Sequence, residues 1–295
     1  MKRTSLIGFA ALATGCLVTS PVNGRTSSQP LQLSEGARYV AMGSSFASGA
    51  GLSAKTASSS RCDRSTFNYA HILANSYGLT LDDVSCGGAT TANVLGPWAE
   101  LPPQIDALTP QTALVTLTIG GNDVNYIGSL IANSCRADGA SADAPNLCEL
   151  IHASGGANFT LPKPTKATWR QLEMNLTQIV KEIRSRSPRA TIVFIDYLTV
   201  LPSHGACARI PLSKSEASQA RAVAKHLAEV TSRVAKNEKA QILGASSLSR
   251  DHDACSPAPW TNAFKSTAHN KDYMPYHPNR AGMVAIADAL ERMLF

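Results

Sequence analysis

Charged residues are scarce in this chain, and they do not gather into runs. They make up 16% of the 295 residues, and aromatic residues make up 6%. The formal net charge of +6 falls to +4 when residues 1–15, which carry Lys2 and Arg3, are removed. A mild positive charge without Lys/Arg runs or interleaved aromatic residues is typical of surface solvation. We therefore predict no nucleic-acid partner.

Motifs for a bound metal are also missing from the sequence. It contains no Cys-x-x-Cys pair and no His/Cys cluster at the spacing of zinc sites. The run Asp251–Asp253 is an alternative cation site, but three contiguous polar residues in a loop are more often merely solvated. We predict no metal and no cofactor.

The apolar run near the N-terminus is too short to span a membrane. This run, Leu6–Leu12, follows Lys2 and Arg3 and precedes small residues, which is the pattern of a secretory signal peptide. We predict a signal peptide over residues 1–24. Residues 25–36 are rich in small and polar residues and predict a flexible tether.

The sequence contains two alternative processing sites at which this signal peptide could end. The run LATGC at residues 12–16 resembles a lipobox, in which Cys16 would carry a lipid and tether the protein to a membrane, although Ala13 stands where leucine is usual. The run VNG at residues 22–24 suits cleavage before Arg25. Both alternatives predict export, either as a secreted protein or attached to the cell envelope.

The number of cysteines agrees with export. The chain has seven, and an even six remain when Cys16 is set aside. Without metal-site spacing, six cysteines in an oxidising compartment predict three disulfides, and the residues themselves leave the pairing open. The six are Cys62, Cys86, Cys135, Cys148, Cys207 and Cys255.

Strand-like and helix-like patterns alternate after the tether. Apolar, β-branched runs predict strands, and 3.6-residue spacing predicts amphipathic helices between them. This alternation predicts a three-layer α/β/α sandwich with about five parallel strands. With no repeat and no shift in composition, we predict one domain over residues 37–295. The strands are expected at 37–42, 79–84, 112–119, 190–197 and 241–243, the helices at 67–78, 166–187, 213–237 and 280–295, and long loops at 128–165 and 245–276.

Polar residues suited to acyl transfer follow several of these strands. Ligands of open parallel sheets bind beyond the carboxyl ends of the strands. There the chain places GSSF (43–46), SCGGATT (85–91) and GGND (120–123), and YHPNRAG (276–282) stands near its end. A serine hydroxyl attacks only when a base removes its proton and donors stabilise the oxyanion. These four blocks supply a serine, glycine N–H groups, a side-chain amide and an imidazole.

In this order, Ser45, Gly88, Asn122 and His277 resemble the SGNH hydrolase superfamily, which includes the GDSL-like lipases and esterases. The resemblance covers residues 37–295 and implies a flavodoxin-like fold. It implies that Ser45 is the nucleophile and His277 the general acid and base. The oxyanion would be held by the Ser45 and Gly88 N–H groups and the Asn122 side chain. Extracellular bacterial esterases of this kind also imply the pairs Cys62–Cys86, Cys135–Cys148 and Cys207–Cys255.

The chain departs from the family pattern at two acidic positions. Ser44 replaces the acid of the Gly-Asp-Ser turn, and Met274 stands three residues before His277, where the family has its usual acid. Three groups are alternatives for orienting the His277 ring: a backbone carbonyl near Met274, the Asp272 carboxylate and the more distant Asp196. Ser44 is also a rival nucleophile, and Gly87 is a rival to Gly88 as oxyanion donor.

The local sequence around the histidine predicts a neutral ring. Pro278 suits the first position of a helix, which would leave His277 near the N-cap. The positive end of a helix disfavours imidazolium, so the ring would remain able to accept a proton.

Together these features predict an exported, monomeric serine ester hydrolase. It would act on lipid or short acyl esters through an acyl-enzyme. A carbohydrate O-deacetylase or an acyltransferase using the same site is the main alternative. The two missing acids also leave open an inactive binding protein on the same fold.

Overall fold

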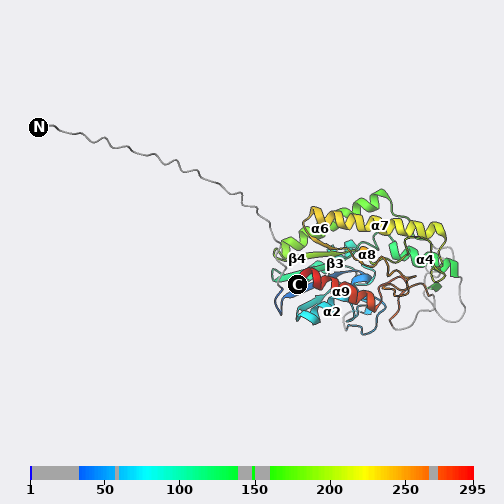
Figure 1. Ribbon diagram of the computed structural model, residues 1–295, viewed down its shortest axis with the longest axis horizontal. Helices are drawn as coiled ribbons and strands as arrows, with labels where there is room; N and C mark the ends of the chain where they lie inside the picture. The colour runs from blue at the N-terminus through cyan, green and yellow to red at the C-terminus, as the bar shows by residue number, and fades with distance from the viewer. Residues whose placement is uncertain (2–32, 57–59, 139–147, 150–159, 266–271) are drawn as a thin grey trace. The chain divides into compact units, whose positions relative to one another are not determined.

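The computed structural model describes residues 1, 33–56, 60–138, 148–149, 160–265 and 272–295 (Figure 1). The predicted signal peptide beyond Met1, Cys16 and most of the predicted tether lie outside these ranges. Residues 31–295 form one compact unit. Among the described residues, no helix combines the length and apolar character needed to cross a membrane.

A single sheet of five parallel strands lies at the centre of this unit. Its strand order is β2-β1-β3-β4-β5, and every neighbouring pair is parallel. The apolar strands β1, β3 and β4 are buried over most of their length, as expected for strands covered on both faces. The strands are β1 (Arg38–Gly43), β2 (Thr80–Asp83), β3 (Thr112–Thr118), β4 (Thr191–Ile195) and β5 (Gln241–Leu243).

Helices cover both faces of the sheet. Figure 1 shows α6 and α7 over one face and α2 and α9 over the other, and α2 packs against α9 while α7 packs against both α4 and α6. The predicted three-layer α/β/α fold is therefore confirmed. The longer helices are α2 (Tyr69–Tyr77), α4 (Tyr126–Asp138), α6 (Lys166–Arg186), α7 (Lys214–Asn237) and α9 (Arg280–Leu294), and the short ones are α1 (Ser45–Ser48), α3 (Thr91–Leu95) and α8 (Ala245–Leu248).

Local capping explains why the helices begin where their sequence pattern begins. The Ser213 side chain accepts a hydrogen bond from the Glu216 N–H, and the Glu216 carboxylate accepts one from the Ser213 N–H. This reciprocal cap satisfies two of the N–H groups that a helix start leaves without partners. At the other end of α2, Gly78 adopts φ +61°, the left-handed conformation that ends a helix readily at glycine.

The five strands and four of the long helices lie within two residues of their predicted bounds. Helix α4 is the exception, because most of it falls in the segment predicted as loop. Its buried residues do follow helical spacing, at Ile127, Leu130, Ile131, Ser134 and Cys135. This helical pattern begins shortly after the polar GGND block. It was overlooked because the rest of the segment 128–165 has no clear periodicity.

Three disulfides connect segments that lie outside the strands. They join Cys62 to Cys86, Cys135 to Cys148, and Cys207 to Cys255. These are the pairs that the family resemblance implies. The first connects the turn at Ser60–Cys62 to the loop that follows β2 and carries Gly88.

Candidate active site

Ser45 stands at the sharp turn between β1 and α1. The preceding Gly43 has φ +135°, and a Cβ at this position would lie 2.4 Å from the Thr118 carbonyl oxygen. Only glycine allows β1 and β3 to approach so closely here. The Gln104 amide fixes the same glycine, accepting from its N–H at 2.7 Å and donating to its carbonyl at 3.0 Å. The turn therefore presents Ser45 from a rigid position.

The His277 ring meets the Ser45 hydroxyl although the two residues are 232 positions apart. Nε2 lies 2.8 Å from the Ser45 Oγ, and Nδ1 lies 2.8 Å from the carbonyl oxygen of Pro275. Because that carbonyl can only accept, Nδ1 carries the proton, and Nε2 is left as the acceptor for the serine hydroxyl. This is the geometry of a nucleophile and its general base.

The group that orients the ring differs by one residue from the predicted carbonyl. The Met274 carbonyl oxygen instead accepts from the His277 backbone N–H at 3.2 Å and from the Asn262 Nδ2 at 3.1 Å. The intervening Tyr276 has φ +62°, and the chain reverses tightly enough there for the Pro275 carbonyl to face the ring two residues on. A carbonyl two residues before the histidine thus makes the contact.

Neither carboxylate alternative reaches the ring. Asp272 accepts a hydrogen bond from the Ser53 N–H, and this bond holds the pKa of its carboxyl below the usual range. Asp196 accepts from the Ser246 N–H at 2.8 Å and from its hydroxyl at 2.6 Å, at the start of α8. Among the described residues, the hydrogen-bond partners of the His277 ring are Ser45 and Pro275.

Burial, rather than a helix end, keeps the His277 ring neutral. The residue is 6% exposed, and desolvation lowers its pKa from 6.5 to about 4. The helix start expected at Pro278 was wrong, because α9 begins at Arg280 and its N-cap is Asn279, whose side chain accepts from the Gly282 N–H. His277 therefore lies two residues before the N-cap. The expected neutral imidazole is therefore present for a different physical reason.

Candidate donors for an oxyanion lie in the segments that follow β1, β2 and β3. Within the described part of the chain, the Ser45 and Gly88 backbone N–H groups donate to no protein acceptor. The rival Gly87 N–H is already engaged, at 2.8 Å from the Cys62 carbonyl. The Asn122 Nδ2 donates to the Ala89 carbonyl at 2.8 Å, and an amide nitrogen carries a second hydrogen. These groups are able to receive a negative oxygen.

Gly88 is glycine for a steric reason. It adopts φ +85°, and an added Cβ would lie 3.2 Å from the Trp98 ring. Asp123, which follows Asn122 in the sequence, has a structural role, because its carboxylate accepts a hydrogen bond from the Thr91 N–H at the start of α3. These contacts fix the two loops that carry the remaining predicted oxyanion donors.

Ser44 points away from the histidine into the core. It is 1% exposed, and its Oγ lies 3.2 Å from the Tyr197 hydroxyl. That hydroxyl also accepts from the Gly121 N–H at 2.9 Å. Tyr197 therefore ties the Ser45 turn to the Asn122 turn, a role that the sequence analysis missed. The only local signal was a tyrosine just beyond β4, at the same edge of the sheet.

The described residues include no cluster of three or more His, Cys, Asp or Glu side chains suited to a metal. The site consists instead of a hydroxyl, a neutral imidazole and amide donors.

The GDSL-like Lipase/Acylhydrolase family matches residues 41–285. Lipase 2 of Streptomyces coelicolor is 31% identical over 284 residues, covering 94% of this chain and 92% of that protein. The structure resembles phospholipase A1 from Streptomyces albidoflavus with a TM-score of 0.68 and 26% identity, over 88% of this chain and 99% of that one. It also resembles an extracellular lipase from Streptomyces rimosus, with a TM-score of 0.67 and 29% identity, over 87% and 99%. The chain therefore belongs to the GDSL-like lipase/acylhydrolase family, whose members are carboxylic ester hydrolases.

Proposed function

We propose that this enzyme hydrolyses esters through an acyl-enzyme on Ser45, with His277 as its general base and acid. The observation that carries the proposal is the 2.8 Å contact between the Ser45 Oγ and the His277 Nε2. The ring at the other end of this contact is buried and neutral, with its pKa lowered to about 4. A neutral imidazole at hydrogen-bond distance is the form that can take the hydroxyl proton at neutral pH.

In the acylation step, the Oγ of Ser45 attacks the ester carbonyl carbon as its proton moves to Nε2 of His277. The carbonyl oxygen becomes an oxyanion, which accepts hydrogen bonds from the Ser45 N–H, the Gly88 N–H and the Asn122 Nδ2. His277 then donates its proton to the departing alkoxide. The products are a free alcohol and an acyl group joined to Ser45.

Deacylation repeats the chemistry with water as the nucleophile. The neutral His277 ring removes a proton from the water, which attacks the acyl carbonyl. The same donors hold the second oxyanion. Collapse of this intermediate returns the proton to the Ser45 Oγ and releases a carboxylic acid, which restores the resting site.

A Ser–His pair is the catalytic unit in this proposal. The imidazolium formed in each step keeps its Nδ1–H bonded to the Pro275 carbonyl, at 2.8 Å in the resting structure. This contact preserves the tautomer and the direction of the ring without a carboxylate. It offers less charge stabilisation than the acid of a Ser–His–Asp triad.

Lipid esters are the substrate class that we propose, and export is the location. Both rest on similarity, because the relatives are lipases and a phospholipase A1, and one is described as extracellular. Three disulfides also favour an oxidising compartment. We propose that the N-terminal segment is removed on export. Mass spectrometry of the mature N-terminus then distinguishes a chain that begins at Arg25 from one that begins at an acylated Cys16.

The proposed nucleophile is tested by labelling and turnover. The purified chain is incubated with p-nitrophenyl esters of increasing acyl length and with a fluorophosphonate probe. Ser45→Ala should abolish labelling and lower kcat by about 10⁴-fold or more. Ser44→Ala is the matched control and should still be labelled. Labelling that persists in Ser45→Ala, or its absence from the parent chain, would contradict the proposal.

A further inference from the structure

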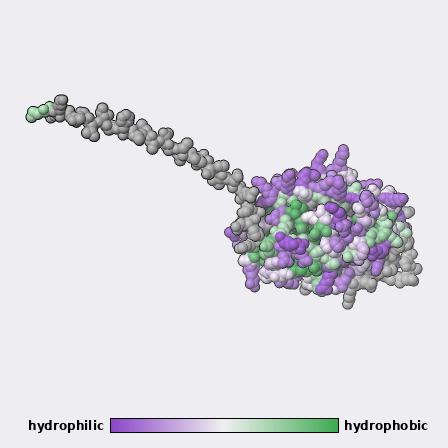
Figure 2. Space-filling model, in the orientation of Figure 1, coloured by the Kyte–Doolittle hydropathy of each residue, from purple (hydrophilic) through white to green (hydrophobic). Residues whose placement is uncertain are grey.

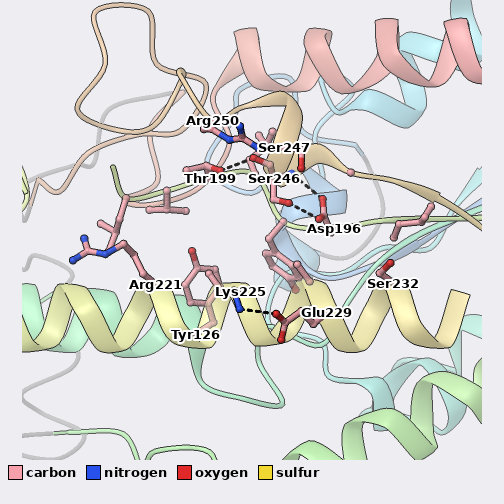
Figure 3. Close-up of a pocket in the computed structure, with 18 of the residues that line it drawn as sticks. Tyr126, Asp196, Thr199, Arg221, Lys225, Glu229, Ser232, Ser246, Ser247 and Arg250 are labelled. Atoms are coloured by element: carbon pink, nitrogen blue, oxygen red, sulfur yellow. Dashed lines mark hydrogen bonds and ion pairs between the residues drawn. The ribbon is translucent and has the colours of Figure 1, made fainter. Parts of the chain in front are cut away.

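A second concave site lies between α7 and the β4–β5 edge of the sheet. It is a groove of about 1050 Å³, and none of Ser45, Gly88, Asn122 and His277 lines it. Figure 3 shows its two sides: α7 carries Lys225 and Glu229 on one, and Thr199, Ser247 and Arg250 lie on the other. The groove is therefore separate from the ester-hydrolysing site.

The walls of the groove are mainly apolar. Ala224 and Ala228 lie four residues apart and so share one face of α7. Their small side chains leave open space between the helix and the sheet. The lining part of α7 runs from Arg221 to Asn237, a length of about 24 Å at 1.5 Å per residue, which suits an extended acyl chain. The other apolar lining residues are Leu198, Val200, Leu201 and Ile242.

Positive charge exceeds negative charge around this apolar space. The two carboxylates already have partners: Glu229 pairs with Lys225 at 2.8 Å, and Asp196 accepts from Ser246. Arg250 is exposed and has no recorded partner in the described part of the chain. The cations that line the groove are Arg221, Lys225, Arg233, Lys236 and Arg250.

A tyrosine side chain also lines the groove. Tyr126 is 3% exposed overall, and among the described residues its hydroxyl has no hydrogen-bond partner. Figure 3 shows this side chain reaching into the groove from beside α7, with its hydroxyl turned toward the side that carries Thr199 and Arg250. A tyrosine hydroxyl that is accessible in the groove can donate a hydrogen bond to a ligand oxygen, so Tyr126 provides such a donor.

We propose that the groove binds one long-chain fatty acid as its carboxylate. The acyl chain lies along Ala224 and Ala228, and the carboxylate faces the opposite side of the groove, formed by Arg250, Ser247 and Thr199, where it accepts from the Tyr126 hydroxyl. An apolar channel lined by an excess of cations matches an anionic amphiphile better than a neutral lipid or a free phosphate. This site goes beyond the proposed ester hydrolysis, and its occupation does not depend on Ser45.

The groove also shares a wall with the ester-hydrolysing site. The Tyr126 ring lies edge-on to Tyr197, with 6.0 Å between the ring centroids. Tyr197 in turn accepts from the Gly121 N–H beside Asn122. A fatty acid in the groove would therefore lie one side chain away from the turn that carries the proposed oxyanion donors.

Binding is measured on the Ser45→Ala chain, so that no turnover interferes. Fluorescent cis-parinarate is titrated first, and oleate and oleyl alcohol are then compared as displacing ligands. Because a charge-assisted hydrogen bond is worth about 1.5–3 kcal/mol, we expect oleate to bind at least tenfold more tightly than oleyl alcohol. Equal binding of the acid and the alcohol would overturn the placement of the carboxylate beside Arg250.

Variants locate the bound ligand. Ala228→Trp fills the channel and should weaken oleate binding at least tenfold, whereas Ala222→Trp, on the same helix but outside the groove, should bind as the parent does. Arg250→Gln should weaken oleate about tenfold and leave oleyl alcohol unchanged, and Lys214→Gln, which is exposed on α7 but outside the groove, is its matched charge control. Melting temperatures confirm that each variant is folded.

Two results would overturn the proposal: no saturable binding of cis-parinarate, or undiminished oleate binding by Ala228→Trp, which would place the ligand elsewhere. Ester hydrolysis is assayed separately on chains that retain Ser45. Loss of the fatty-acid site therefore leaves the proposed function standing, and loss of hydrolysis leaves the site standing.

Discussion

Two loops of this enzyme stand where relatives carry an acid, and each fills the place differently. In the β1–α1 turn, Ser44 replaces the acid with a hydroxyl that contacts Tyr197 at 3.2 Å. In the loop before α9, the Pro275 carbonyl contacts the His277 Nδ1 at 2.8 Å. The first contact is between neutral core groups that keep their charge state. The second faces a ring that gains a proton in each catalytic step of the proposed mechanism.

The difference follows from the charge that each loop must accommodate. At Ser44 the side chain has only to hold a turn, and a hydroxyl that forms hydrogen bonds can do this. A hydroxyl also avoids the cost of burying an unpaired carboxylate at this position. At His277 a carbonyl fixes the ring but supplies only a dipole when imidazolium forms. We infer that the Ser44 side chain serves structure, whereas the Pro275 carbonyl serves chemistry.

The largest expected difference in kcat is between a variant at His277 and a variant at Ser44. His277→Ala removes the proposed base and should lower kcat by about 10⁴-fold or more. Ser44→Ala removes the hydroxyl contacts to Tyr197 and to the Thr118 carbonyl and should keep kcat within about tenfold of the parent. Steady-state hydrolysis of a p-nitrophenyl ester measures both. Comparable losses in the two variants would remove the distinction.

A second test concerns the pH dependence of the histidine loop. Because burial lowers the pKa of His277 to about 4, the ring stays unprotonated through the mildly acidic range. The acid limb of kcat/KM should therefore lie near pH 4 rather than near 6.5. The unfolded chain binds a proton at the ordinary histidine pKa, so the free energy of unfolding should fall as pH drops from about 6.5 to about 4.

An acid introduced at position 274 provides a further test of the pKa of His277. Met274→Asp places a carboxyl at the position where the family has one, and a negative charge near the ring should raise the pKa of His277. The acid limb of kcat/KM should then move upward from pH 4 toward 6.5, with Met274→Asn as the uncharged control. An unchanged pH profile in Met274→Asp, with the protein folded, would show that the added carboxyl does not face the ring.

A smaller effect is expected at the contact between Ser44 and Tyr197. Tyr197→Phe removes the acceptor of the Gly121 N–H and the partner of Ser44. It should lower the free energy of unfolding by about 1–3 kcal/mol, because a buried donor loses its hydrogen bond. Thermal or urea unfolding measures this loss, and the acid limb of the pH–rate profile should not move. A shifted limb would mean that Tyr197 acts on His277 as well.

Apolar runs and short motifs in the sequence were enough to predict the strands and the candidate site residues. Contacts that depend on the folded backbone could not be predicted in this way. Strand positions followed from the apolar runs, and the Ser45, Gly88, Asn122 and His277 blocks followed from the ends of those strands and the family resemblance. The Pro275 contact depends on the left-handed backbone of Tyr276 (φ +62°), which no residue pattern indicates at a tyrosine. Likewise, the Tyr197 bridge joins three segments that only the folded sheet brings together.

The smallest expected effect is at the carboxylate nearest the histidine in sequence. Asp272 is engaged with the Ser53 N–H and is exposed, so Asp272→Asn keeps an acceptor at this position while removing the charge. We expect kcat and the acid limb to remain within about twofold of the parent, since the Pro275 carbonyl continues to orient the ring. Asp196→Asn is the buried counterpart and should affect stability more than kcat. A loss of about 10⁴-fold in either variant would identify a true triad acid and would make the histidine loop a carboxylate-assisted site, like those of relatives that keep the acid.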